Sequence, residues 1–186
     1  MAAAKLRIAG GSARGLPLAE PRGLRLRPTS GLVREAVFNI LGDLVVDASV
    51  LDLYAGTGAL GIEALSRGAA RATFVDAEAA ACQAILQSLS RAAFTERATV
   101  LRGRLPRALS TVTGPFDLIF MDPPYQEETA SDTLLALPEY LAADGTVVYE
   151  HGSRYNPPER LAGLQLTERR VYGDSAIALY ALQEGE

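Results

Sequence analysis

Strand-like and helix-like segments alternate between residue 49 and about residue 150, and this alternation limits the possible folds more than any other feature. It predicts an α/β, doubly wound and mostly parallel sheet. Two further β-like runs, at about 164–172 and 176–182, meet at Gly173-Asp174 and predict a hairpin at one sheet edge. The apolar runs expected to form strands are 50–53, 72–76, 98–101, 116–121 and 145–150, and the expected helical segments are 62–67, 78–92, 105–109, 129–136 and 138–142.

The residues before this alternation form a separate pattern. Segments 5–9 and 14–18 can pair as a short hairpin around a Gly-Gly-Ser turn. Thr29-Ser30 can cap a helix that we expect to end near Gly42. We therefore expect an N-terminal extension over 1–43 and a main domain over 44–186.

The extension and the main domain also differ in charge. Residues 1–35 contain seven basic and two acidic residues, a net charge of +5, whereas the rest contains 11 basic and 20 acidic residues, a net charge of −9. Arginine, which supplies most of the basic residues, makes forked contacts to phosphate. The charge distribution predicts an anionic partner that docks on the extension.

Two residue counts exclude several classes of protein. Cys82 and His151 are the single cysteine and the single histidine, so a disulfide within the chain and a multi-histidine metal site are impossible, and we expect no metal. Cys82 is expected to be a buried helix residue, and His151 to be structural or to lie beside the substrate. The apolar stretches are too short to span a bilayer and the start lacks a signal-peptide core, so we expect a cytoplasmic protein without membrane contact.

A glycine-rich loop follows the first strand and opens a helix, in the run Asp52-Leu-Tyr-Ala-Gly-Thr-Gly-Ala-Leu-Gly61. Glycines permit a sharp turn and the close approach of a ligand. Asp76 lies 24 residues after Asp52, at the end of the next strand, where a carboxylate can accept hydrogen bonds from ribose hydroxyls. NAD and S-adenosylmethionine both match this pattern. The negative charge of Asp52 disfavours a pyrophosphate and favours the cationic S-adenosylmethionine.

The run Asp122-Pro123-Pro124-Tyr125 ends the apolar strand at 116–121. Ligands of open α/β sheets bind at the carboxyl ends of the strands, so this run is expected in the same crevice as the glycine loop. The Asp122 carboxylate and a proline carbonyl form an acceptor-only clamp for an –NH2 group. Tyr125 offers a flat face on which a base can stack. The motif predicts a site that holds an –NH2 group with its lone pair free to attack.

Both motifs resemble those of class I S-adenosylmethionine-dependent methyltransferases. The resemblance extends to the bacterial 16S rRNA guanine-N2 methyltransferases of the RsmD family along almost the whole chain. The residues that carry it are Arg7-Ile-Ala-Gly-Gly11 with Arg14-Gly15, Arg27-Pro-Thr, Val33-Arg34-Glu35, Phe38-Asn39, the segment from Leu51 to Ala69, and Arg170-Val-Tyr-Gly173.

The resemblance implies a seven-stranded, Rossmann-like methyltransferase sheet with an antiparallel C-terminal strand and an RNA-binding N-terminal extension. It also implies methylation of the N2 amine of one guanine, guanine 966 in rRNA numbering, during assembly of the small subunit. The implied partner is 16S rRNA within an assembling or assembled 30S subunit, and the protein is expected to be a monomer. The expected residues are Asp122, Pro123, Pro124 and Tyr125 for catalysis, Asp52, Tyr54, Ala55, Gly56, Gly58, Asp76 and Ala77 for the cofactor, and Arg7, Arg14, Arg27 and Arg34 for RNA.

This sequence departs from the family pattern in two places. Gly31-Leu32 replaces the usual Asp-Arg, and Arg104-Leu105 stands where the family often has Asp or Asn followed by Ala near the adenine. Two kinds of alternative function stay open. One is another amino-group methyltransferase with the same clamp, acting on adenine N6 in DNA or on a protein glutamine. The other is a non-catalytic RNA-binding assembly module.

Overall fold

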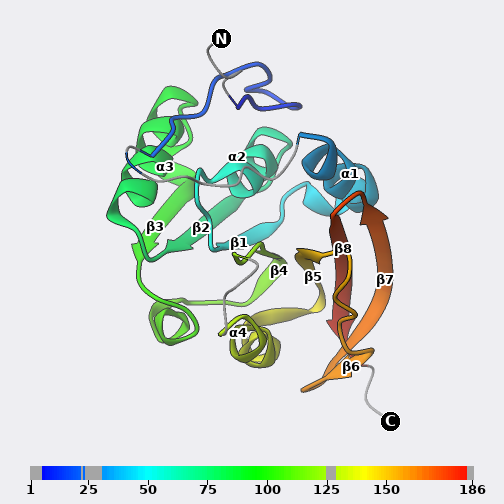
Figure 1. Cartoon of the computed structure of the whole chain (residues 1–186). Helices are drawn as coiled ribbons and strands as arrows, with labels where there is room; N and C mark the ends of the chain where they lie inside the picture. Colours follow the sequence, from blue (N-terminus) through cyan, green and yellow to red (C-terminus); the bar gives the residue numbers. More distant parts are fainter. Residues whose placement is uncertain (1–5, 22, 24–30, 125–128, 184–186) are drawn as a thin grey trace.

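The computed structural model describes residues 6–21, 23, 31–124 and 129–183, which form an eight-stranded sheet with helices on both faces (Figure 1). The strand order is β3-β2-β1-β4-β5-β8-β7-β6. The strands are β1 Ser49–Leu53, β2 Arg71–Asp76, β3 Ala98–Arg102, β4 Phe116–Met121, β5 Leu141–Gly152, β6 Arg160–Leu161, β7 Leu164–Tyr172 and β8 Ser175–Leu182. The helices are α1 Gly31–Leu41, α2 Ala59–Ser66, α3 Ala79–Arg91 and α4 Ala130–Ala136, with 3₁₀ turns at Gly42–Val45, Thr95–Arg97, Arg107–Thr111 and Leu137–Tyr140.

The first five strands run parallel, and the last three complete the sheet in antiparallel pairs. Every residue of β1 is buried, as is typical of a central parallel strand covered on both faces. β4 lies directly beside β1, with Leu53 opposite Met121. Because parallel strands share one carboxyl edge, the segments that follow β1 and β4 emerge next to each other.

Hydrophobic cores lie on the two faces of the sheet. The first joins α1, α2 and α3 to the sheet, and the second lies beneath α4 (Figure 1). Successive strand residues point to opposite faces, so Phe120 contributes to the first core and Met121 to the second. In the first core the ring of Phe120 packs against that of Phe38 on α1, with centroids 5.8 Å apart. Helix α1 is therefore fixed to the centre of the sheet.

The predicted N-terminal hairpin is present in the described residues. The Ile8 N–H donates to the Leu16 carbonyl at 3.0 Å, and the Gly15 N–H donates to the Ile8 carbonyl at 2.8 Å. Ile8 and Leu18 are buried in the first core, together with the apolar residues of α1. The extension and the main domain therefore share one core, and the boundary between them at residues 43–44 stays a prediction.

The predicted fold class is confirmed, and the predicted strand at 116–121 coincides with β4. The expected seven strands are one too few, because the two-residue strand β6 pairs with β7. β5 begins at Leu141 rather than at residue 145, across an irregular register with β4. The Thr29-Ser30 cap lies outside the described residues. Within the described ranges, no helix has both the length and the apolar character that a bilayer span requires.

Candidate functional site

The glycine loop after β1 turns sharply at its two glycines. Gly56 and Gly58 have φ values of +56° and +73°, in the region that favours glycine. A Cβ atom on Gly58 would lie 2.9 Å from the Cγ1 atom of Ile85 on α3, so no side chain fits between the loop and that helix. The Gly58 carbonyl then accepts the Ile62 N–H at 2.9 Å, and α2 starts from the loop.

Asp76 holds the glycine loop from the neighbouring strand. Its Oδ2 atom accepts the Gly56 N–H at 2.7 Å, and its Oδ1 atom accepts the Glu78 N–H at 2.9 Å. One carboxylate thus connects the loop to the start of α3. Each carboxylate oxygen has a second lone pair, so the predicted contact with ribose hydroxyls remains chemically possible.

Asp52 lies inside the molecule, beneath the start of α2. It is 2% exposed, and its Oδ2 atom accepts the Gly61 N–H at 2.9 Å. Burial raises the pKa of Asp52 well above its ordinary value, and the nearby carboxylates of Asp122 and Asp76 raise it further against the effect of the Gly61 hydrogen bond. Three carboxyl groups therefore converge where β1, β2 and β4 end.

The remaining predicted cofactor residues border the loop. Tyr54 shares a hydrogen bond of 2.8 Å with the Thr133 hydroxyl, which connects the glycine loop to α4. Ala55 is buried, and its N–H donates to the Val75 carbonyl at 3.1 Å. The carbonyl of the half-buried Ala77 accepts a hydrogen bond from Arg102 at 3.2 Å.

The Asp-Pro-Pro run follows β4 as predicted. Asp122 is half-buried, Pro123 is buried and Pro124 is exposed. Because Leu53 and Met121 are paired neighbours, Asp122 emerges beside Tyr54 at the start of the glycine loop. The structure therefore brings the two predicted motifs together. Tyr125 lies outside the described residues.

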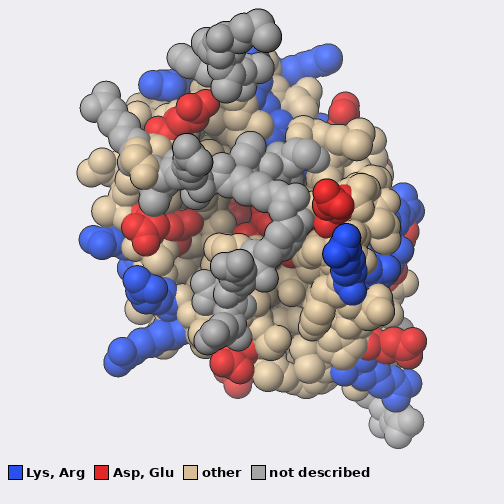
Figure 2. Space-filling view, viewed as in Figure 1, with Lys and Arg blue, Asp and Glu red and all other residues tan. Residues whose placement is uncertain are grey.

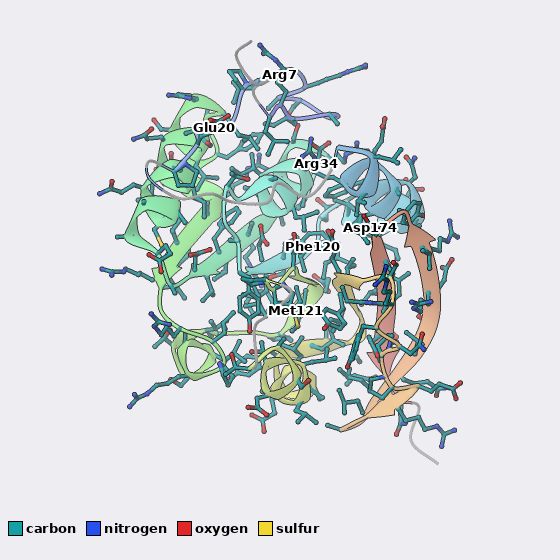
Figure 3. All side chains as sticks on the ribbon, in the orientation of Figure 1. Arg7, Glu20, Arg34, Phe120, Met121 and Asp174 are labelled. Carbon is teal, nitrogen blue, oxygen red and sulfur yellow. The ribbon has the colours of Figure 1, made fainter. Side chains whose placement is uncertain are left out.

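Arg7 and Arg14 are exposed on the hairpin, as a contact with RNA requires. The Nη1 atom of Arg7 donates to the Gly15 carbonyl at 2.7 Å, which steadies the hairpin turn. Figure 3 shows Arg7 on the hairpin at the outer edge of the molecule. Arg27 lies outside the described residues.

The expectation that Arg34 contacts RNA is corrected by the structure. Arg34 is 3% exposed, lies 3.5 Å from a Glu63 carboxylate oxygen, and donates to the Arg7 carbonyl at 2.7 Å. Burial lowers the pKa of Arg34, and Glu63 opposes this effect. The guanidinium therefore holds the extension against α2 instead of facing solvent (Figure 3).

Sequence reasoning missed the role of Glu63 on α2. Its side chain is 1% exposed, and its two oxygens accept the N–H groups of Ala9 at 2.8 Å and Gly10 at 2.7 Å. Arg34 and Arg67 supply the compensating positive charge. The signal in the sequence was a lone acid among apolar helix residues, which inside a protein must be paired.

The described hairpin also docks on Ser66, one turn later on α2. The Ser66 hydroxyl donates to the Gly10 carbonyl at 2.6 Å and accepts the Ala13 N–H at 2.9 Å. Gly11 has a φ of +75°, and a Cβ atom there would lie 1.9 Å from the Ser66 carbonyl oxygen. The Gly-Gly turn is thus shaped to fit the helix that starts at the glycine loop.

Comparison with known proteins decides the family. Residues 6–181 match the family model described as Conserved hypothetical protein 95. The chain belongs to this family. Its relatives include the Ribosomal RNA small subunit methyltransferase D of Escherichia coli (strain K12), which is 35% identical over 178 residues, covering 95% of this chain and 89% of that protein.

A second relative and a solved structure also match this chain over nearly its whole length. YlbH of Bacillus subtilis (strain 168), which carries a provisional name as an rRNA methyltransferase, is 38% identical over 181 residues, covering 94% of this chain and 98% of that protein. The solved structure of yhhF from Escherichia coli superposes with a TM-score of 0.82 at 34% identity, covering 97% of this chain and 99% of the other. These findings confirm the family that the sequence motifs predict.

Proposed function

We propose that this protein transfers a methyl group from S-adenosylmethionine to the exocyclic N2 amine of a guanine in 16S rRNA. The observation that carries the proposal is the meeting of the glycine loop and the Asp122-Pro123 run at the paired ends of β1 and β4. Relatives named as ribosomal RNA small subunit methyltransferase D support rRNA as the substrate class. By the family resemblance, the target is guanine 966 of an assembling or assembled 30S subunit.

The charge of the crevice fits a cationic cofactor. The carboxylates of Asp76 and Asp122 lie close enough to Asp52 to raise the free energy of ionising the Asp52 side chain. The sulfonium and ammonium groups of S-adenosylmethionine would relieve this repulsion, whereas the pyrophosphate of NAD would add to it. Asp76 would bind the ribose hydroxyls with its remaining lone pairs. The cofactor supplies the methyl group and a sulfide leaving group.

The run after β4 would hold the base. A carboxylate oxygen of Asp122 and the Pro123 carbonyl would accept hydrogen bonds from the two N2–H groups and leave the nitrogen lone pair facing the methyl carbon. Methyl transfer would form the N–C bond as the C–S bond breaks, and the methylated amine would release one proton to water. Correct alignment contributes about 7–11 kcal/mol in well-oriented reactions. Turning the guanine out of its stack would bring it onto Tyr125.

The N-terminal extension would bind the RNA backbone. Arg7 and Arg14 are exposed on the hairpin, and Arg27 belongs to the same basic segment. Figure 2 shows the molecule from the side viewed in Figure 1. On this face, Lys and Arg side chains lie mainly around the rim, and acidic side chains lie both at the rim and nearer the middle. Phosphates would therefore meet the rim, while the cationic cofactor occupies the acidic part. We propose that the protein acts as a monomer.

The test uses methyl-labelled S-adenosylmethionine and 30S subunits from a strain that lacks this activity. The expected result is label in 16S rRNA, recovered as N2-methylguanosine at a single position after digestion and mass analysis. DNA and protein substrates are offered in parallel. Label in DNA adenine or in protein glutamine would contradict the proposed substrate but would agree with the proposed clamp for an –NH2 group. RNA binding without transfer to any of these substrates would support the assembly-module alternative.

A further inference from the structure

An aromatic cluster surrounds the single histidine at the carboxyl end of β5. His151 is 3% exposed, and its ring centroid lies 5.3 Å from that of Tyr149 and 5.5 Å from that of Tyr155. Within the part of the chain that the structure describes, the Nε2 atom is shielded from solvent and has no hydrogen-bond partner. An unsatisfied buried polar atom is costly, so this one requires an explanation.

The other ring nitrogen fixes the chemistry of Nε2. Nδ1 lies 2.9 Å from the Gly152 carbonyl oxygen, which can only accept a hydrogen bond. Nδ1 therefore carries the ring proton, and Nε2 presents a lone pair. Burial lowers the pKa of His151, and the positive charge of Arg169 lowers it further against the effect of the Gly152 carbonyl. The imidazole is thus a neutral hydrogen-bond acceptor.

The position of His151 relates it to the proposed base clamp. β5 runs parallel to β4, and Met121 is paired with Tyr149. Continued by one residue, this register places Asp122 beside Glu150, the residue before His151. Neighbouring strands lie about 4.8 Å apart, which is within the reach of one purine. The cluster therefore lies at the same carboxyl edge of the sheet from which the Asp122 run emerges.

We infer that Nε2 of His151 accepts the N1–H of the target guanine and makes His151 a specificity-determining residue against adenine. The inference rests on the proposed function. In guanine, the N1–H and the N2 amine lie side by side and both donate. A carboxylate, a proline carbonyl and an imidazole lone pair would match this all-donor edge. Adenine offers an amine beside an unprotonated N1, and two acceptors would then face each other.

Tyr155 forms the solvent-exposed side of the cluster. Its side chain is 45% exposed, whereas Tyr149 on the other side of the imidazole is 8% exposed. On β8 the neighbours of the cluster are small: Ala176 is paired with His151 and Ala178 with Tyr149. A turn of the Tyr155 ring would open Nε2 to a base without displacing the strand.

The test compares guanine with 2-aminopurine at the target position of 30S subunits reconstituted from synthetic rRNA. 2-Aminopurine keeps the N2 amine but has a bare N1. The wild-type protein is expected to methylate guanine about 10- to 100-fold faster in kcat/KM, because an unpaired buried acceptor costs that much. In His151→Gln the amide can donate to N1, so the preference should fall to within about threefold.

Tyr149→Phe is the matched control, because it keeps a ring against the imidazole and removes only a hydroxyl; its preference should equal that of the wild type. Thermal unfolding and cofactor binding report whether His151→Gln folds. If the wild-type protein methylates the two purines at equal rates, the inference is overturned and the proposed function stands. This comparison does not depend on whether His151→Gln folds. An unchanged preference in a folded His151→Gln protein would also overturn it. A wild-type protein that methylates neither purine at N2 would overturn the proposed function and this inference together.

Discussion

The Oε1 atom of Glu63 accepts a hydrogen bond of 2.7 Å from the backbone N–H of Gly10, a residue 53 positions earlier in the chain. The same side chain lies between two arginines. A single buried acid on α2 therefore holds the N-terminal hairpin against the helix that starts at the glycine loop. This connection leads to the first prediction.

Glu63→Ala should destabilise the protein by about 3–5 kcal/mol, because it leaves the Arg34 guanidinium buried and unpaired. Urea unfolding measures the change. Glu96→Ala, at an exposed position, is the control and should change stability by less than about 0.5 kcal/mol. A Glu63 variant as stable as this control would contradict the clamping role.

Gly11→Ala and Gly15→Ala form a matched pair on the hairpin. Both glycines have positive φ values. A Cβ atom on Gly11 would lie 1.9 Å from the Ser66 carbonyl oxygen, whereas a Cβ atom on Gly15 would have no neighbouring atom within 4 Å. Gly15→Ala should cost about 1–2 kcal/mol for backbone strain alone. Gly11→Ala should cost clearly more, since the hairpin must also leave α2. Equal losses in thermal unfolding would show that the hairpin does not dock as described.

Asp52→Asn should stabilise the cofactor-free protein at neutral pH. Burial raises the pKa of Asp52 above its unfolded value of about 3.9, so the folded state binds the proton more tightly. In the wild type, the stability gained from binding this proton is complete below the pKa of Asp52 in the unfolded chain. It is lost as the pH rises through the pKa of Asp52 in the folded protein. Denaturation midpoints from pH 4 upward should therefore fall more in the wild type than in the variant. Parallel pH curves would exclude the buried acid as the cause.

Asp122→Asn should reduce methyl transfer by about 100-fold or more while RNA binding is kept. The amide places a donor where the proposed clamp needs an acceptor, and loss of one such contact in a reacting site costs about 10²–10³ in rate. Single-turnover transfer of labelled methyl groups measures the effect. Asp132→Asn, exposed on α4, should transfer at the wild-type rate. Undiminished transfer by the Asp122 variant would refute the mechanism.

Replacing Arg7 and Arg14 together by Gln should weaken RNA binding and flatten its dependence on salt. Each lost phosphate contact lowers the slope of log K against log[salt] by about 0.7–0.9. Binding is measured between 50 and 200 mM salt, and Arg154→Gln, at an exposed position after β5, serves as the comparison. If the slope is unchanged, these two arginines do not bind the RNA backbone.

The strand alternation predicted the parallel part of the sheet well because central parallel strands are continuous apolar runs. β4 was predicted residue for residue. The two-residue strand β6 carries no such signal, since its pairing depends on where β7 lies. Among the site residues, the positions of Asp122 and the glycine loop followed from strand order. The burial of Arg34 could not be predicted, because its charge is compensated by Glu63, which is 29 residues away and becomes a neighbour only after folding.

Asp76 combines a proposed contact with the cofactor and a structural role in holding the glycine loop. Its carboxylate holds both the Gly56 N–H and the Glu78 N–H. An attempt to change cofactor preference by replacing Asp76 alone would also free the loop that shapes the proposed cofactor site. A successful redesign would have to supply new acceptors for both N–H groups at the same time, so natural or laboratory evolution of this position should proceed by paired substitutions.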